Sequence, residues 1–167
     1  MATIGILIED YFDEREVVYP YYRLREAGHE TLVIGPRTGT FHGKSSFTMD
    51  AAAASGSVEA RSLGGLIVPG GFAPDRMRRD RAMLDLVRAV DRTGKPLGAI
   101  CHAGWVLVSA GVARGRQLTG FSSIKDDLVN AGADYLDDRV VVDRNLVTAQ
   151  HADDLPAFLA AFLALLA

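Results

Sequence analysis

The stretch KPLGAICHAGWVLVSAG, residues 95–111, contains the only cysteine of the 167-residue chain. Its apolar run, Leu97 to Ile100, is typical of a buried parallel strand, and helical spacing of apolar residues begins at Ala103 and ends at Gly111. We therefore predict that Cys101 lies where a strand turns sharply into a helix, which is the geometry of a nucleophile elbow. Small neighbouring residues allow such a strained turn.

A lone cysteine is often no more than a small buried hydrophobic residue. The position of Cys101 argues for chemistry, because open parallel sheets bind ligands at the carboxyl ends of their strands and His102 follows directly. The positive end of the helix dipole favours a thiolate at this point. We predict that Cys101 is a partly exposed nucleophile whose pKa lies below that of a free thiol.

The composition favours one globular domain over residues 1–167, with 49% hydrophobic and 23% charged residues. A single cysteine excludes an intramolecular disulfide framework and fits a reducing compartment, so we expect a cytoplasmic protein. The first residues lack a basic leader and are interpreted as a strand rather than a signal peptide. Charges interrupt every apolar run well short of about 20 residues, so no membrane contact is expected. A net charge of −3 gives no reason to expect a nucleic-acid partner.

Short apolar runs alternate with helical patterns along the chain. The expected strands are 4–8, 31–34, 66–68, 97–100, 117–121, and a hairpin or edge pair at 140–142 and 146–148. The expected helices are 13–27, 80–93, 103–111, 124–130 and 153–166, with Pro20 kinking or ending the first, a small β excursion at 35–50 and a loop or weak helix at 51–61. This alternation predicts an α/β fold, a doubly wound and mostly parallel sheet with helices on both faces.

Loops that follow parallel strands meet at one edge of the sheet, so three further elements should gather near Cys101. The acidic segment from Glu9 to Glu16 either places a carboxyl group beside the thiol or forms a solvated helix start. Gly70 and Gly71 either form an oxyanion hole with the amide of His102 or begin an ordinary loop. Asp75 either orients an imidazole or caps a helix.

The histidines differ in their expected roles. His102 is a candidate base, although the direction of its side chain decides that role and the sequence does not fix it. His151 follows the strand ending at Thr148 and could reach the same edge. We expect neither a metal nor a cofactor.

Five motifs occur in order along the chain. They are Tyr19-Pro-Tyr21, Gly28-His29-Glu30, Val68-Pro-Gly-Gly71 with Ala73-Pro74, Ala99-Ile-Cys101-His102-Ala-Gly with Ser109-Ala-Gly-Val112, and Ile124-Lys-Asp-Asp-Leu with Asn130-Ala-Gly-Ala. Together they resemble the PfpI family of the ThiJ/PfpI superfamily, over about Ile4 to Phe162. The resemblance implies a class I glutamine-amidotransferase-like (flavodoxin-like) sandwich, a cytoplasmic homodimer or hexamer, and stress-linked cysteine chemistry. That chemistry is a deglycase or glyoxalase activity on methylglyoxal or glyoxal adducts, or an intracellular peptidase activity.

Carried over by position, the resemblance implies the roles of the catalytic groups. The family's nucleophile falls on Cys101 and its histidine on His102, while its oxyanion donors fall on the backbone of Gly71 and His102. Its triad acid, which comes from a neighbouring subunit, falls on Asp75. We therefore expect the working site to lie at a subunit interface and to need two subunits.

The family's glutamate at the nucleophile falls on Asp13, with Glu14 one residue later. We predict that Asp13 or Glu14, rather than Glu9 or Glu16, forms a hydrogen bond to Cys101, with a pKa raised by burial. An aspartate also stands at this place in the related isonitrile hydratases.

Three residues are candidates for the substrate side of the site. Glu16 stands at a further familiar acidic position of the family. Gln150 stands where relatives commonly carry an arginine, which removes a positive charge near the pocket. His151 follows it.

Three hypotheses for function remain open on the sequence. The first is a cysteine hydrolase in which Cys101 attacks a carbonyl and His102 or an acid handles the proton. The second is a small-molecule hydratase of the isonitrile hydratase kind on the same scaffold, suggested by Asp13. The third is a redox-responsive or chaperone-like stress protein without turnover. A glutaminase subunit is disfavoured, because its downstream His-x-Glu pair does not occur here.

Overall fold

A seven-stranded sheet runs through the middle of the computed structural model, which describes residues 1–166, in the order β10-β11-β7-β6-β1-β2-β5. Its strands are β1 (Thr3–Leu7), β2 (Glu30–Gly35), β5 (Ala53–Ala54), β6 (Gly65–Val68), β7 (Leu97–Ile100), β10 (Val140–Asp143) and β11 (Leu146–Ala149). Neighbouring strands pair in parallel except β10 and β11, which pair antiparallel at one edge.

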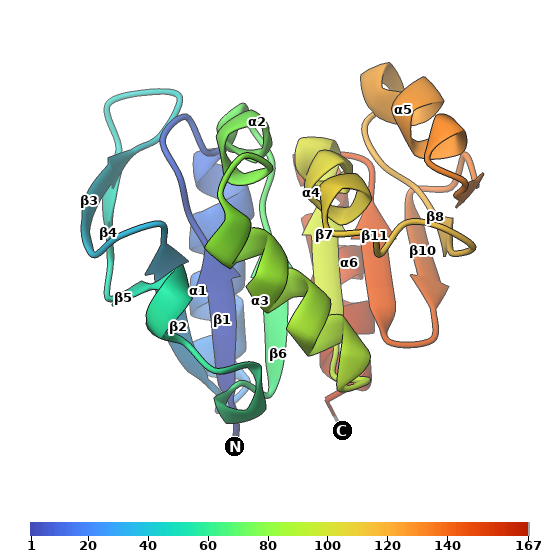
Figure 1. Ribbon diagram of the computed structural model, residues 1–167. Helices are drawn as coiled ribbons and strands as arrows, with labels where there is room; N and C mark the ends of the chain where they lie inside the picture. The colour runs from blue at the N-terminus through green and yellow to red at the C-terminus, as the bar shows by residue number, and fades with distance from the viewer. Residues whose placement is uncertain (167) are drawn as a thin grey trace.

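Helices cover both faces of this sheet (Figure 1). One face carries α1 (Glu14–Glu26) and α6 (Leu155–Ala164), and the other carries α2 (Ala73–Met77), α3 (Arg81–Arg92) and α4 (Gly104–Ser109). The short helix α5 (Lys125–Asn130) lies beyond the β11 side of the sheet. This arrangement confirms the predicted doubly wound α/β fold. Within residues 1–166, no helix has both the length and the apolar character needed to cross a bilayer.

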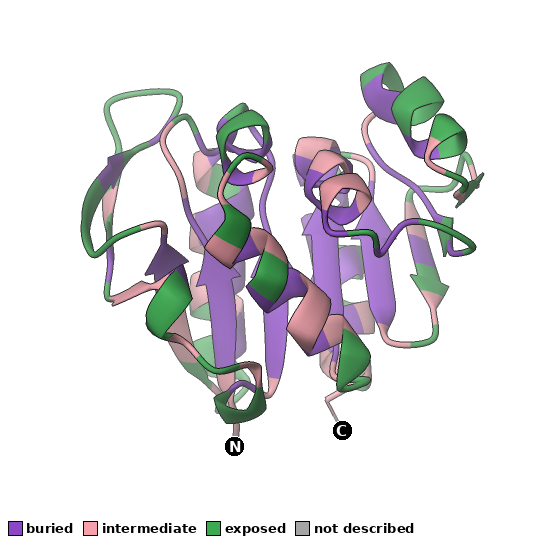
Figure 2. Cartoon of the chain, viewed as in Figure 1, coloured by how far each residue is buried: buried purple, intermediate pink, exposed green. Residues whose placement is uncertain are grey.

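The central strands are buried along their whole length (Figure 2). Strands covered on both faces are expected to be continuously apolar, as β6 and β7 are. The glycine within β7 serves the packing of α6, because a Cβ at Gly98 would lie 2.7 Å from Cζ of Phe158. The helix therefore seats its aromatic side chains directly on the strand that leads to Cys101.

The remaining elements are small. The excursion after β2 is a hairpin, β3 (Gly39–His42) with β4 (Thr48–Ala51), and a separate parallel pair joins β8 (Gln117–Leu118) to β9 (Asp134–Tyr135). The region expected as a loop or weak helix instead holds β5 and two 3-10 turns. The 3-10 turns of the chain are Ser55–Ser57, Ala60–Ser62, Cys101–Ala103, Ser122–Ile124 and Ala152–Asp154.

Pro20 does not end the first helix, because α1 continues through it to Glu26. A proline within a helix removes the hydrogen bond to the carbonyl four residues earlier, here that of Glu16. Pro20 is buried, so the packing of α1 compensates for the missing bond.

Candidate active site

Cys101 lies at a strained turn between β7 and the 3-10 turn that leads into α4. Its φ is +61°, in the left-handed region that a residue with a side chain rarely adopts. Such a conformation costs about 1 to 3 kcal/mol and is kept where the surrounding structure enforces it. Gly70 makes room for the turn, because a Cβ there would lie 2.7 Å from Cβ of Cys101. The predicted nucleophile elbow is therefore present.

Glu16 is the carboxyl group at the thiol. It is 1% exposed, its side chain forms a hydrogen bond with Cys101, and its Oε2 accepts the N–H of Gly70 at 2.7 Å. Burial, followed by the negative charge of Asp13, raises the pKa of Glu16 to about 7. The prediction that Asp13 or Glu14 would contact Cys101, with Glu16 only on the substrate side, is therefore wrong.

The helix geometry of α1 explains this error. Asp13 is the N-cap, and its Oδ1 turns back to accept the N–H of Arg15 at 3.1 Å. Glu14 lies on the other side of the helix, where its Oε1 accepts the N–H of Ser45 at 2.6 Å and its hydroxyl at 2.8 Å. Because residues two apart in a helix point to nearly opposite sides, Glu16 faces the sheet edge when Glu14 faces away.

The thiol of Cys101 is protonated at neutral pH. Burial and then the charge of Glu16 raise its pKa to about 12, against hydrogen bonds from the backbone of Gly71 and His102. Cys101 is only 9% exposed. The prediction of a partly exposed thiol with a lowered pKa is therefore wrong. The α4 helix has six residues, so its dipole is too small to outweigh burial beside a carboxylate.

Two backbone N–H groups point to the sulfur of Cys101, those of Gly71 and His102. Gly71 has a φ of +74°, and a Cβ there would lie 2.4 Å from the backbone nitrogen of Asp13, so only glycine fits. Both donors are placed to stabilise negative charge on or next to the sulfur. The N–H of Gly70 is already bound to Glu16, which corrects its expected role as a third donor.

The imidazole of His102 faces the thiol within the same chain. Its Nδ1 lies 3.2 Å from Sγ of Cys101, and its Nε2 lies 3.2 Å from Oγ of Ser123. The ring stacks on Phe121 at 4.7 Å between centroids and meets the edge of Trp105. Burial and then the positive charge of Lys44 lower the pKa of His102, so the ring is neutral at neutral pH.

An ion cluster around the buried carboxylate of Asp13 closes one side of the site. Oδ2 of Asp13 lies 2.8 Å from Nζ of Lys44 and 3.0 Å from Nη2 of Arg15. Burial of Asp13 opposes its ionisation, but hydrogen bonds and charges of Arg15 and Lys44 outweigh burial and lower its pKa to about 2. Sequence reasoning missed both Lys44 and Ser123, because no motif marks either residue and their partners are distant in the chain.

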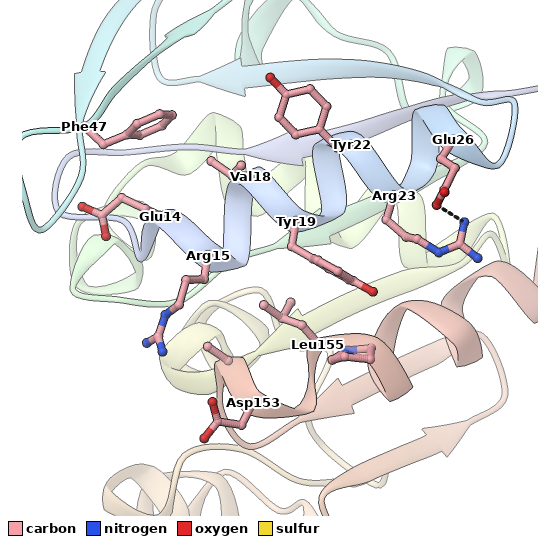
Figure 3. A pocket seen from close by; sticks show the side chains of 12 residues that line it. Glu14, Arg15, Val18, Tyr19, Tyr22, Arg23, Glu26, Phe47, Asp153 and Leu155 are labelled. Carbon is pink, nitrogen blue, oxygen red and sulfur yellow. Dashed lines mark ion pairs between the residues drawn. The ribbon is translucent and has the colours of Figure 1, made fainter.

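A cavity of about 150 Å³ opens onto Cys101. Its lining residues are Asp13, Arg15, Glu16, Lys44, Gly71, Phe72, Cys101, His102, Phe121, His151 and Ala152. Four residues predicted for the site are not among them, namely Glu14, Gly70, Asp75 and Gln150. A larger groove of about 1150 Å³ runs beside it between α1 and the start of α6, and shares Arg15 and Ala152 with the cavity (Figure 3).

The residues expected on the substrate side are separated by the structure. Gln150 donates from Nε2 to Oδ1 of Asp137 at 2.9 Å, away from the cavity. His151 lines the cavity mouth, and its Nδ1 lies 3.2 Å from Oδ2 of Asp154. Over residues 1–166, no group of three or more His, Cys, Asp or Glu side chains is arranged to hold a metal ion.

The chain is similar to known proteins over almost its whole length. A sequence profile described as the DJ-1/PfpI family matches residues 2–165. A protein named as a deglycase from Pyrococcus abyssi is 41% identical over 161 residues, which cover 96% of this chain and 97% of that protein. A protein from Escherichia coli named protein/nucleic acid deglycase 2 is 41% identical over 160 residues, which cover 93% of this chain and 92% of that protein.

A solved structure is similar to almost the whole of this chain. It is a two-domain protein of Anabaena variabilis that contains DJ-1/ThiJ/PfpI-like and ferritin-like domains, with 37% sequence identity and a TM-score of 0.96. The match covers 98% of this chain and 48% of that one, so this chain spans about half the length of the two-domain protein.

Proposed function

The chain belongs to the DJ-1/PfpI family, and on that premise we propose that it is a cysteine-dependent deglycase acting on methylglyoxal or glyoxal adducts. The observation that carries the proposal is the hydrogen bond between buried Glu16 and Cys101 at a strained elbow. A thiol attacks a carbonyl only as its proton leaves, and Glu16 is a carboxylate with a pKa near neutrality at the required place. Similar proteins that bear the name deglycase add support.

The contacts define the first chemical step. The sulfur of Cys101 forms a bond to the carbonyl carbon of the adduct, and the π electrons of the carbonyl move onto its oxygen. The thiol proton passes to the carboxylate of Glu16, so charge is conserved. The N–H groups of Gly71 and His102 face the negative charge that develops beside the sulfur. Protonated Glu16 then gives this proton to the amine or thiol of the adduct, which leaves as its bond to carbon breaks.

His102 assists this step without carrying charge. Its neutral ring faces Sγ through Nδ1, so it either accepts a hydrogen bond from the thiol or donates one to the thiolate, according to the tautomer. Phe121 and Trp105 hold the ring in place by packing on its face and edge. The histidine therefore acts as a neutral partner of the sulfur, with Glu16 as the base.

We propose further that the chain works as a cytoplasmic homodimer or hexamer whose sites lie near subunit boundaries. Phe72 supports this, because it lines the cavity and yet is 64% exposed. Asp75 is exposed on α2 just beyond it, so that a neighbouring copy could receive its carboxylate at His102. Inactive Cys101→Ser and Asp75→Ala chains should then regain partial activity when assembled together. Mixed oligomers without activity, or full activity in Asp75→Ala alone, would contradict the shared site.

The structure weakens the two competing hypotheses. The hydratase hypothesis depended on an aspartate beside the thiol, whereas Glu16 occupies that place. The redox-sensor hypothesis depended on an accessible thiolate, whereas the thiol is buried with a raised pKa.

Turnover of methylglyoxal adducts tests the proposal. Wild type should release N-acetylcysteine from its methylglyoxal hemithioacetal, and Cys101→Ser should fall to the uncatalysed rate. An isonitrile and a fluorogenic peptide serve as competing substrates in the same assay. Background rates on the adduct, together with turnover of either competitor, would refute the deglycase assignment.

A further inference from the structure

Two cations line the cavity that opens onto Cys101, and one carboxylate holds both. Asp13 receives Nζ of Lys44 at 2.8 Å, and Nε and Nη2 of Arg15 at 3.1 and 3.0 Å. Among residues 1–166, Asp13 is the only hydrogen-bond partner found for either side chain, which leaves two N–H groups of Lys44 and both N–H groups on Nη1 of Arg15 for a ligand. Asp13 thus fixes both side chains in position, and each keeps N–H groups that can bind a ligand.

The carboxylates around this pair neutralise Arg15 more than Lys44. Asp13 bonds to both cations, and the charge of Glu16, which is hydrogen-bonded to the thiol, acts on both. The further carboxylate that acts on Arg15 is Asp153, at the start of α6 (Figure 3). Lys44 has no such neighbour, and its positive charge reaches the ring of His102. Lys44 is therefore the stronger site for an anion.

The rest of the cavity limits what the anion can be. Phe72, Phe121 and Ala152 form an apolar part of the wall. The space of about 150 Å³ admits a group of only a few carbon atoms between this wall and Lys44. A compact organic carboxylate satisfies both features, because its carbon atoms pack on the apolar wall and its oxygens accept from Lys44 and Arg15.

We propose that Lys44, assisted by Arg15, binds a carboxylate of the substrate and selects adducts that carry this group close to the reacting carbonyl. The inference rests on the proposed function for the identity of the reaction, and on the structure alone for the anion site.

Alkylation of Cys101 tests the anion site without any turnover. Iodoacetate and iodoacetamide react by the same displacement: the sulfur bonds to the CH₂ carbon, iodide leaves, and the thiol proton is lost to base. The reagents are nearly the same size and differ in charge, and the chain has one cysteine to report. The ratio of their rates therefore cancels any change in thiol pKa and isolates attraction to the anion.

Replacing Lys44→Gln should lower the iodoacetate-to-iodoacetamide ratio about threefold to tenfold, because a partly exposed charge a few ångströms from the carboxylate is lost. Lys44→Arg should keep the ratio close to that of wild type, and Arg15→Gln should lower it less. Lys125→Gln, on α5 outside the cavity, is the matched control and should leave it unchanged. An unchanged ratio in Lys44→Gln, or an equal fall in Lys125→Gln, would overturn the proposal. Raising the salt concentration on wild type gives the same test without a substitution, and a ratio that does not fall also counts against it.

A substrate pair separates this inference from the proposed function. The methylglyoxal adducts of N-acetylcysteine and of its methyl ester differ in one carboxylate. Wild type should favour the free acid in kcat/KM, and Lys44→Gln should lose the preference. Equal kcat/KM values in wild type would overturn the selectivity while leaving the deglycase assignment standing. Failure of both adducts to react, with the expected alkylation ratios, would refute the deglycase assignment and leave the anion site standing.

Discussion

Two faces of helix α1 carry glutamates two residues apart, and the same side chain behaves differently on each. Glu16 is buried against Cys101, where burial raises its pKa to about 7. Glu14 lies beside the groove and accepts two hydrogen bonds from Ser45, and its pKa is lowered, because these bonds outweigh its slight burial. The helix face on which a glutamate lies therefore decides whether its pKa comes near neutrality.

Activity gives the sharpest test of this comparison. Glu16→Gln removes the proton acceptor but keeps the side-chain size, so kcat/KM on the methylglyoxal adduct should fall about 100-fold to 1000-fold. Glu14→Gln alters the other face and should stay within about threefold of wild type. Steady-state rates on the two purified variants, with circular dichroism to confirm folding, check the prediction. Similar losses of kcat/KM in both variants would show that the helix face does not distinguish Glu16 from Glu14.

The pH dependence of stability is the next largest effect. The pKa of Glu16 is about 7 in the folded chain against an ordinary value of 4.5, so between pH 4.5 and pH 7 the folded chain keeps a proton that the unfolded chain has lost. The contribution of this carboxyl group to the free energy of unfolding is therefore fully present below about pH 4.5 and is lost as the pH rises to about 7. The loss is roughly 3 kcal/mol, at about 1.36 kcal/mol per pKa unit.

Urea unfolding at pH 5 and pH 8 measures this loss. Wild type should lose more stability over the interval than Glu16→Gln, whose side chain does not titrate. The Glu14→Gln variant should follow wild type. Parallel curves for wild type and Glu16→Gln would mean that Glu16 is not protonated in the folded chain at pH 5.

The elbow at Cys101 and the alternation of strands and helices were predictable, because they depend on local apolar patterns and on the rule that parallel strands present their carboxyl ends together. The choice among Asp13, Glu14 and Glu16 was not, because the positional match to the family placed the acid on Asp13. The helix start was predicted to within one residue, but the direction in which each side chain leaves the N-cap at Asp13, which turns Glu16 onto the thiol, was not part of that prediction.

Site residues that come from distant segments of the chain could not be predicted from the sequence either. Lys44 comes from the turn between β3 and β4, and Ser123 from a 3-10 turn after β8. Neither has a neighbour in sequence that marks it for the site. The pKa of Cys101 was misjudged for a related reason, because the local helix dipole was visible while the burial and the carboxylate of Glu16 were not.

A substitution at Gly70, where the loop after β6 lies against the elbow, should have an effect of intermediate size on stability and activity. Gly70→Ala would place a Cβ 2.6 Å from Oε2 of Glu16 and 2.7 Å from Cβ of Cys101, so the variant should lose about 1 to 3 kcal/mol of stability and most activity. Gly56→Ala is the matched control, because the nearest atom to its Cβ would be 3.7 Å away. Thermal unfolding of both variants measures the difference. A Gly70→Ala protein as stable and active as the control would show that the two loops have room to move apart.

Ser123 should give the smallest effect. Its hydroxyl lies 3.2 Å from Nε2 of His102 and fixes the ring whose other nitrogen faces the sulfur. Ser123→Ala should lower kcat about threefold to tenfold with little change in KM, and Ser123→Thr should restore it. Nitrogen chemical shifts of His102 report the tautomer directly. An unchanged tautomer and unchanged kcat in Ser123→Ala would remove this residue from the site.

In the proposed mechanism, Glu16 is the titrating base at Cys101. Infrared difference spectroscopy of the carboxyl C=O band, with Glu16→Gln subtracted from wild type, measures its pKa without reference to any substrate. The structure predicts a midpoint near the value of about 7 that burial and the charge of Asp13 produce. A midpoint near 4.5, the ordinary value for a glutamate, would show that Glu16 does not titrate as the base at neutral pH.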